Sequence, residues 1–218
     1  CQFVEGDYRK ILACTREWGR KSALPYYHRM RHDGYFRHLL VRKAVKTEEI
    51  LIDIVTASEE GFDSKPKEFL DKWAAALQAL ELTGKIVGIL HTKNDSLADI
   101  VKDEGTEVLF GQDYFYEELL GLKFKITPFS FFQTNSLGAE VLYEKAREYI
   151  GDTNEKVVFD LYSGTGTIAQ ILAPVAKKVV GVEIVEEAVE AAKVNAKLNE
   201  LDNWTFWAGD VLKAIDEQ

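Results

Sequence analysis

The chain has 218 residues, of which 46 % are apolar and 29 % are charged, and its formal net charge is −9. No run approaches the roughly 20 apolar residues that a membrane-spanning helix needs, and no apolar signal segment opens the sequence. Two cysteines, Cys1 and Cys14, argue against a disulfide scaffold. We therefore expect a cytoplasmic globular protein with no membrane partner. Because Cys1 stands first, we expect the native start to lie elsewhere.

The charge is unevenly distributed along the chain. Residues 8–46 hold eleven Lys or Arg and two acidic residues, a net charge of +9, so the remainder carries −18. A basic segment on an acidic body indicates a surface that faces phosphate groups. Arg37 and Arg42 are our candidates for RNA contacts there. The solvated face of a helix and a hairpin would explain the same charges equally well.

The first half of the chain predicts a mixed α+β domain, which we set at residues 1–125. Apolar spacing indicates helices, and β-branched runs on both sides of a short polar turn indicate a β-hairpin. An extended pair with Gly121 in its turn closes the domain. The predicted elements are a helix at 6–22, a hairpin at 36–45 and 49–58, a helix at 65–82, a strand at 85–93 and the extended pair at 113–128.

After Pro128 the pattern changes to alternating strands and helices. This is the order of a parallel α/β sheet, so we expect the N-terminal part of a Rossmann-like domain over residues 126–218. Its first strand, which starts at Lys156, is expected to be buried. Three strands are fewer than the five or six of an ordinary open sheet, so we expect a truncated sheet.

Three acidic residues fall at strand ends that share one edge of this sheet. Asp160 ends the first strand, and Gly164 and Gly166 follow in the turn to a helix. Glu183 ends the second strand, where an acid in Rossmann-like folds accepts hydrogen bonds from ribose hydroxyls. Asp210 ends the third strand, where it is placed to take the exocyclic amine of adenine. This constellation predicts a bound adenosine group.

The glycine turn distinguishes between nucleotides. A dinucleotide fingerprint needs G-x-G-x-x-G, whereas this turn reads SGTGTIAQ, with a threonine at position 167 and no third glycine. The methionine end of S-adenosylmethionine needs an open turn, and it needs no backbone N–H groups arranged to bind a phosphate. We therefore predict S-adenosylmethionine as the cofactor.

Several motifs resemble those of RNA uracil-5-methyltransferases of the TrmA/RumA type. These are FFQTN followed by a helix, DLYSGTGT, VVGVE and AKLNEL, and the resemblance covers nearly the whole chain. GYFRHLLVRKAV followed by EILIDIVT is similar to the central domain of bacterial members that act on 23S ribosomal RNA. The resemblance implies methylation of uracil carbon-5 in RNA, with ribosomal RNA favoured over transfer RNA.

The resemblance also implies roles for individual residues. Gln133 would contact S-adenosylmethionine, and Tyr162 and Thr167 would line its methionine end. Glu183 would hold the ribose, and Asp210 would lie near the adenine. A wall of Phe129, Phe131 and Phe132 would exclude water, although plain core packing also explains these rings.

The sequence departs from that family in three ways. The family's nucleophilic Cys and its general base lie downstream of the position that matches Gln218, so we expect no catalytic residue here and no activity from this chain alone. Cys1 resembles the last of four iron–sulfur ligands, so a cluster is expected only in a longer protein, and no metal site here. A small N-terminal barrel is also missing. We expect a piece of a longer enzyme, one that is less stable than its parent or self-associates through the truncated sheet.

Two other functions fit the same sequence. A different S-adenosylmethionine-dependent methyltransferase, acting on a small molecule or a protein, would suit the overall acidity. A non-catalytic RNA-binding module would suit the basic segment and would bind no cofactor. RNA binding that weakens when Arg37 and Arg42 are replaced would argue against the first alternative.

Overall fold

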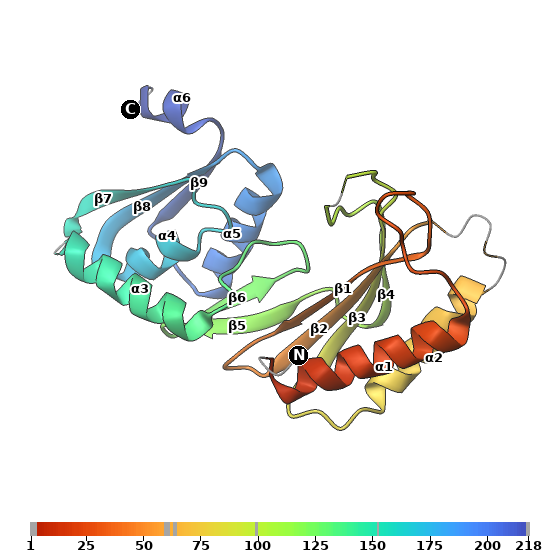
Figure 1. The fold of residues 1–218 in the computed structure, drawn as a ribbon. Helices are drawn as coiled ribbons and strands as arrows, with labels where there is room; N and C mark the ends of the chain where they lie inside the picture. The colour runs from red at the N-terminus through yellow and green to blue at the C-terminus, as the bar shows by residue number, and fades with distance from the viewer. Residues whose placement is uncertain (1–3, 59–61, 63–64, 99, 152, 217–218) are drawn as a thin grey trace. The chain divides into compact units, whose positions relative to one another are not determined.

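The computed structural model describes residues 4–58, 62, 65–98, 100–151 and 153–216. The chain divides into two compact units (Figure 1). The first unit comprises Cys1–Lys43 and Glu48–Phe115, and the second comprises Ala44–Thr47 and Tyr116–Gln218. None of the helices in these described ranges combines the length and the apolar character that crossing a bilayer requires.

The first unit is a four-stranded sheet with two helices on one face (Figure 1). Strand order is β1-β2-β3-β4; β1 and β2 form the predicted antiparallel hairpin, and β2 and β3 run parallel with α2 between them in the chain. The elements are α1 (Gly6–Ser22), β1 (Phe36–Lys43), β2 (Glu49–Thr56), α2 (Lys65–Gln78), β3 (Lys85–Lys93) and β4 (Thr106–Gly111).

The core of the first unit lies between this sheet and its helices. Ile11 on α1 and Trp73 on α2 are fully buried, and they pack with alternate residues of β2 such as Ile52. The indole Nε1 of Trp73 donates a hydrogen bond of 3.0 Å to Thr15 Oγ1 and so joins the two helices. Burial of this apolar helix face stabilises the unit, since isolated helices of this length are marginal in water.

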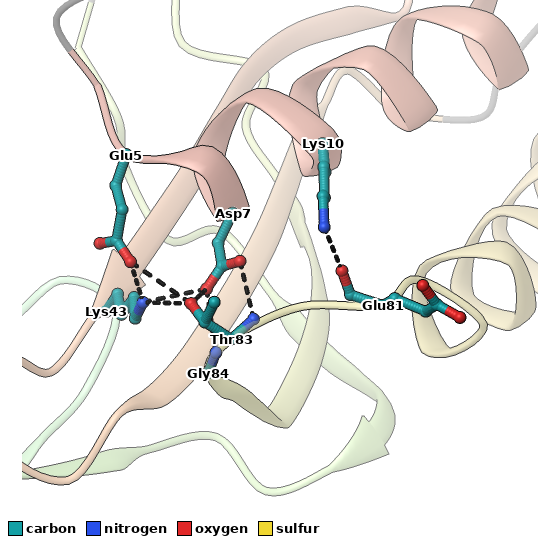
Figure 2. Close-up of polar contacts among 7 residues, drawn as sticks. All are labelled: Glu5, Asp7, Lys10, Lys43, Glu81, Thr83 and Gly84. Atoms are coloured by element: carbon teal, nitrogen blue, oxygen red, sulfur yellow. Dashed lines mark hydrogen bonds and ion pairs between the residues drawn. The ribbon is translucent and has the colours of Figure 1, made fainter.

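A buried charge network fixes the start of α1 (Figure 2). The Asp7 carboxylate accepts hydrogen bonds from the backbone N–H groups of Thr83 and Gly84, each at 2.9 Å, and from Lys43 Nζ at 2.9 Å. The Asp7 side chain is 2 % exposed and the Lys43 side chain 8 %. Burial alone would raise the pKa of Asp7, but the hydrogen bonds from Thr83, Gly84 and Lys43 hold it well below its ordinary range. The network ties α1, β1 and the loop before β3 together.

The second unit holds the parallel sheet and a hairpin (Figure 1). Strands β7, β8 and β9 pair in that order and run parallel, and α4 and α5 pack on one face of this sheet. The elements are β5 (Phe115–Leu119), β6 (Leu122–Ile126), α3 (Ser136–Ile150), β7 (Thr153–Leu161), α4 (Thr167–Leu172), a 3₁₀ turn (Ala173–Val175), β8 (Ala176–Glu183), α5 (Glu186–Leu198), β9 (Trp204–Ala208) and α6 (Val211–Asp216).

Asn195 of α5 and Asn199, which follows the last residue of that helix, hydrogen-bond the backbone of β6 as a neighbouring strand would. Asn195 Oδ1 accepts from Lys125 N at 2.7 Å, and Asn199 Oδ1 accepts from Lys123 N at 2.7 Å. The Asn199 amide also donates to the Lys123 carbonyl at 2.9 Å. Four residues of helix rise about 6.0 Å and two residues of strand about 6.6 Å, so the two spacings match.

The division between the units therefore lies earlier than residue 126. It falls between Phe115 and Tyr116, because β6 is held to α5 by side-chain amides and belongs to the second unit. The hairpin turn Ala44–Thr47 also joins that unit, since Glu117 accepts hydrogen bonds from the backbone of Val45 and Lys46. Neither contact has a local signature in the sequence.

The expectation that the first parallel strand is buried was wrong. Strand β7 lies at the edge of the three-stranded sheet, and Val157, Phe159 and Leu161 are 38–49 % exposed. The central strand β8 has both neighbours, so its Val179, Val180 and Val182 are buried. An apolar sequence does not reveal whether a strand is central or at an edge.

Replacing Asp7 by Asn should destabilise the first unit by about 3 kcal/mol at neutral pH, because the buried Lys43 ammonium then loses its buried counter-charge. Urea unfolding followed by circular dichroism measures this loss. The control is Glu5→Gln, whose side chain also pairs with Lys43 but is 52 % exposed and should cost less than about 1 kcal/mol. Equal losses in the two variants would contradict a special role for Asp7.

Candidate functional site

The carboxyl ends of the parallel strands meet at one edge of the second unit's sheet. In the register of the sheet Asp160 pairs with Gly181, and Glu183 pairs with Ala208. Open α/β sheets bind ligands at this edge. Asp160 and Glu183 lie at the ends of β7 and β8, whereas Asp210 lies two residues beyond the end of β9.

Glu183 holds two turns at this edge. Its Oε2 accepts a hydrogen bond from Gly164 N, and its Oε1 accepts one from Val185 N, both at 3.0 Å. A carboxylate has about four acceptor positions, so each oxygen keeps capacity for one further donor. The side chain is half-buried and borders a pocket, which leaves that capacity available to a ligand.

The pocket beside Glu183 has a volume of about 520 Å³. It brings together the segment after β6, the glycine turn after β7, the end of β8 and the first turns of α5. Its lining residues are Thr127, Phe129, Ser130, Phe131, Gly164, Thr165, Glu183, Val185, Glu187, Ala188 and Ala191. Sequence reasoning missed seven of these residues, although first-turn residues of the helix after Glu183 could have been expected at the same edge. They are Thr127, Ser130, Thr165, Val185, Glu187, Ala188 and Ala191.

The three phenylalanines of the FFQTN region divide between pocket and core. Phe129 and Phe131 line the pocket and are 38 % and 74 % exposed. Phe132 is 8 % exposed and packs against Phe124 of β6, with ring centroids 5.8 Å apart. Core packing therefore explains Phe132, whereas the other two rings form a wall of the pocket.

The chemistry of the lining fits an adenosine group without a pyrophosphate. Two carboxylates, of Glu183 and Glu187, and no Lys or Arg stand among the described residues that line the pocket. Such a lining repels a dianionic pyrophosphate and tolerates a cationic ligand. Hydroxyl donors would satisfy the spare acceptor positions of Glu183, and apolar side chains would cover a flat ring. These properties match S-adenosylmethionine.

Gln133 lies outside the lining of that pocket. Its side chain is exposed and hydrogen-bonds the hydroxyl of Tyr143, a buried residue of α3. Burial raises the pKa of Tyr143, and the nearby charge of Asp160 raises it further. The amide is therefore held by a protein partner in the middle of α3.

Asp160 has a role that the sequence did not assign. Its Oδ2 accepts a hydrogen bond of 2.9 Å from Ala169 N in the first turn of α4. Burial raises the pKa of Asp160 to about 6, although this hydrogen bond opposes the rise. The carboxyl group thus holds the helix that follows the glycine turn.

Tyr162, Thr167 and Asp210, three further predicted cofactor residues, do not line the pocket. Tyr162 is 73 % exposed and has a positive φ of 62°. Thr167 opens α4, with its hydroxyl 3.5 Å from that of Thr165. Asp210 is exposed, and its Oδ1 accepts a hydrogen bond of 2.8 Å from Leu212 N at the start of α6.

Gly166 and Gly164 both have left-handed backbone conformations, with φ of 71° and 53°. A Cβ on Gly166 would lie 2.7 Å from the ring of Phe206 and 2.8 Å from Ala192. A Cβ on Gly164 would meet nothing within 4 Å. Close packing of turn, helix and strand therefore requires glycine at 166, whereas only the backbone angle favours it at 164.

The two arginines proposed for RNA contacts are engaged within the first unit. Arg37 stacks over the Tyr27 ring at 4.2 Å and donates to the Asn94 carbonyl at 2.7 Å. Arg42 is half-buried, lies 5.5 Å from the centre of the Phe115 ring, and has its pKa lowered by burial. RNA contact by these two residues stays a prediction.

Among the residues with described positions, no group of three or more His, Cys, Asp or Glu side chains is arranged to hold a metal ion. Cys1, the candidate iron–sulfur ligand, lies outside the described residues.

Residues 152–218 match the family model of a methyltransferase domain. The chain is 52 % identical over its whole length to an uncharacterized RNA methyltransferase of Clostridium tetani, and 49 % identical to one of Caldanaerobacter subterraneus. The chain spans 46 % and 47 % of the lengths of these two relatives, which is about half.

A solved structure resembles most of the chain. It is the tRNA (uracil-54, C5)-methyltransferase of Pyrococcus abyssi in complex with S-adenosyl-L-homocysteine. The match has a TM-score of 0.72 and 25 % identity, and it covers 93 % of this chain and 46 % of that one. The fold of the second unit is the Rossmann-like fold of S-adenosylmethionine-dependent methyltransferases.

Replacing Gly166 by Ala should destabilise the second unit by about 2–4 kcal/mol, because the positive φ and the contact with Phe206 both oppose a Cβ. Gly164→Ala is the matched control and should cost about 1 kcal/mol, since only the backbone angle opposes it. Urea midpoints of the two variants measure the difference. A larger loss in the Gly164 variant would contradict this account of the turn.

The raised pKa of Asp160 predicts a pH dependence. The folded state holds this proton up to about pH 6, whereas an unfolded Asp loses it near pH 3.9. The folded state therefore binds more protons between these values, and the contribution of Asp160 to stability falls as the pH rises from about 4 to 6. Asp160→Asn should gain up to about 2 kcal/mol relative to the parent between pH 4 and pH 7.5. Urea unfolding at both pH values tests this; a constant difference would contradict it.

Proposed function

We propose that this chain is the cofactor-binding half of an RNA methyltransferase that uses S-adenosylmethionine. The observation that supports this most is the pocket beside Glu183, which combines a ribose-type acceptor, a glycine turn and an aromatic wall, with no Lys or Arg among the described residues that line it. Homologues over the whole chain carry the name RNA methyltransferase, and the proposal extends that activity to this protein. We propose that the enzyme acts in the cytoplasm.

In this proposal Glu183 binds the ribose hydroxyls with the acceptor positions left over from Gly164 and Val185. Phe129 and Phe131 shield the cofactor from water. The turn at Gly164 and Thr165 leaves room for the methionine end. When bound, S-adenosylmethionine supplies an electrophilic methyl group. Gln133 and Asp210 would reach the cofactor only after leaving their present partners, Tyr143 and the start of α6.

The proposed target is carbon-5 of uracil in RNA, with ribosomal RNA favoured. Two observations support the base: the FFQTN and DLYSGTGT motifs, and the likeness to a protein described as a tRNA (uracil-54, C5)-methyltransferase. That neighbour acts on transfer RNA, so the preference for ribosomal RNA rests on the motifs around the β1–β2 hairpin. Enzymes that react with a base must first take it out of its stack.

The chain by itself should bind cofactor but not methylate RNA. Uracil carbon-5 is a weak nucleophile, so methylation needs a thiolate that adds to the base. Cys14, the cysteine of the described residues, lies on α1 in the first unit, and burial raises the pKa of its thiol. A raised pKa disfavours the thiolate, so Cys14 is unsuited to that step.

Calorimetric titration of S-adenosylmethionine into the chain tests the proposal. Saturable binding is expected, and Glu183→Ala should weaken it at least about tenfold because the ribose loses its acceptor and the turn loses its support. The matched control is Glu190→Ala on the exposed face of α5, which should bind as the parent does. No binding by the folded parent, or equal binding by the Glu183 variant, would contradict the proposed site.

A further inference from the structure

Most cations of the basic segment 8–46 already have partners inside the protein. Lys43 is buried against Asp7, Lys21 pairs with Glu17, and Arg31 pairs with Asp33. Lys46 pairs with Glu140, and Lys10 donates to the Glu81 carbonyl. The net charge of +9 in the sequence is therefore a poor guide to where an anion would bind.

Three arginines of α1 are exceptions. Arg9, Arg16 and Arg20 are exposed, and within the described residues none of their guanidinium groups takes part in an ion pair. Their spacing of seven and four residues puts all three within about 40° around the helix axis. Arg9 and Arg20 are about 16 Å apart along that axis. Together they form an arginine stripe on the solvent side of α1.

A groove runs beside the stripe, between α1 and the edge strand β1. Its volume is about 130 Å³, and Arg16 borders it. Tyr26, which is 56 % exposed, forms part of its wall, with its hydroxyl directed at Gly19 and its ring 5.4 Å from that of Phe36. The lining residues are Leu12, Thr15, Arg16, Gly19, Tyr26, Phe36, Arg37, His38, Leu39 and Ile54.

We propose that this groove and the arginine stripe bind single-stranded RNA. The phosphates would lie along Arg9, Arg16 and Arg20, and a base would stack on the open face of Tyr26. A row of cations beside an exposed aromatic ring is the arrangement that single-strand binders use. The inference rests on the proposed function and assigns a surface of the first unit to its RNA substrate.

The alternative occupant, an extended peptide added to β1, fits less well. The outer edge of β1 is already bonded near its start, where Tyr27 N donates to the Phe36 carbonyl at 2.9 Å. A peptide would also leave three arginines without acidic partners. Phosphates satisfy them by charge, so the charge pattern favours RNA.

The test is fluorescence polarisation of a labelled single-stranded oligouridylate with the full chain at several salt concentrations. The variant with Arg9, Arg16 and Arg20 all replaced by Ala should lose affinity at least about tenfold in 50 mM salt, and its salt slope should fall by about 2. The control replaces Lys85, Lys177 and Lys178 by Ala, which removes the same charge from exposed sites elsewhere. Its affinity and salt slope should change little.

Variants of Tyr26 distinguish the contribution of base stacking to RNA binding from that of charge. Tyr26→Ala should weaken binding roughly five- to hundredfold with an unchanged salt slope, whereas Tyr26→Phe should bind as the parent does. Circular dichroism confirms that each variant is folded. Equal losses in the arginine and lysine triple variants, or no loss in either the arginine or the Tyr26→Ala variant, would overturn the inference.

The outcomes also separate this inference from the proposed function. If the parent chain binds oligouridylate and the arginine variant binds equally well, the groove assignment fails while an RNA substrate stands. If the parent binds no RNA and no cofactor, the proposed function fails as well. Cofactor titration of the arginine variant should match the parent, because α1 belongs to the first unit and the pocket to the second.

Discussion

The carboxylate of Glu183 connects two turns through one side chain. One oxygen holds the turn after β7 at Gly164, and the other holds the start of the segment that leads into α5 at Val185. Without this acceptor, the backbone N–H groups of Gly164 and Val185 would lose their hydrogen-bond partner in the protein. The position of the glycine turn, and with it one wall of the pocket, depends on this pair of hydrogen bonds.

The parallel pairing of β7, β8 and β9 explains why the sequence revealed this edge so well. A parallel sheet places every strand end on one side, so three strand-end acids had to gather there once the strand–helix alternation was recognised. Helix α1 was predicted over the residues that it occupies, because its apolar spacing is local information. The hairpin of β1 and β2 was predicted for the same reason.

Features that depend on contacts between distant residues could not be predicted in this way. The unit boundary moved because Asn195 and Asn199 bond the backbone of β6, some 70 positions earlier in the chain. The exposure of β7 depends on its neighbours in the sheet. Whether Lys43 and Arg37 are available to a ligand depends on Asp7 and Asn94, partners that come close only when the chain folds. Glu187 lines the pocket and Asp160 accepts a hydrogen bond from Ala169 N, two contacts that residue type alone does not signal.

The asparagine contacts between α5 and β6 have a consequence for ligand entry. Residues 127–131 follow directly from β6 and supply the aromatic wall of the pocket, while α5 supplies the opposite wall through Ala188 and Ala191. The side chains of Asn195 and Asn199 bond β6 to the helix, so the segments that carry the two walls are joined by hydrogen bonds. A ligand that enters between them does not have to bring separate parts of the chain together, so little conformational entropy is lost on binding. Asn195 and Asn199 do not line the pocket, so substitutions there would act on affinity by loosening its walls.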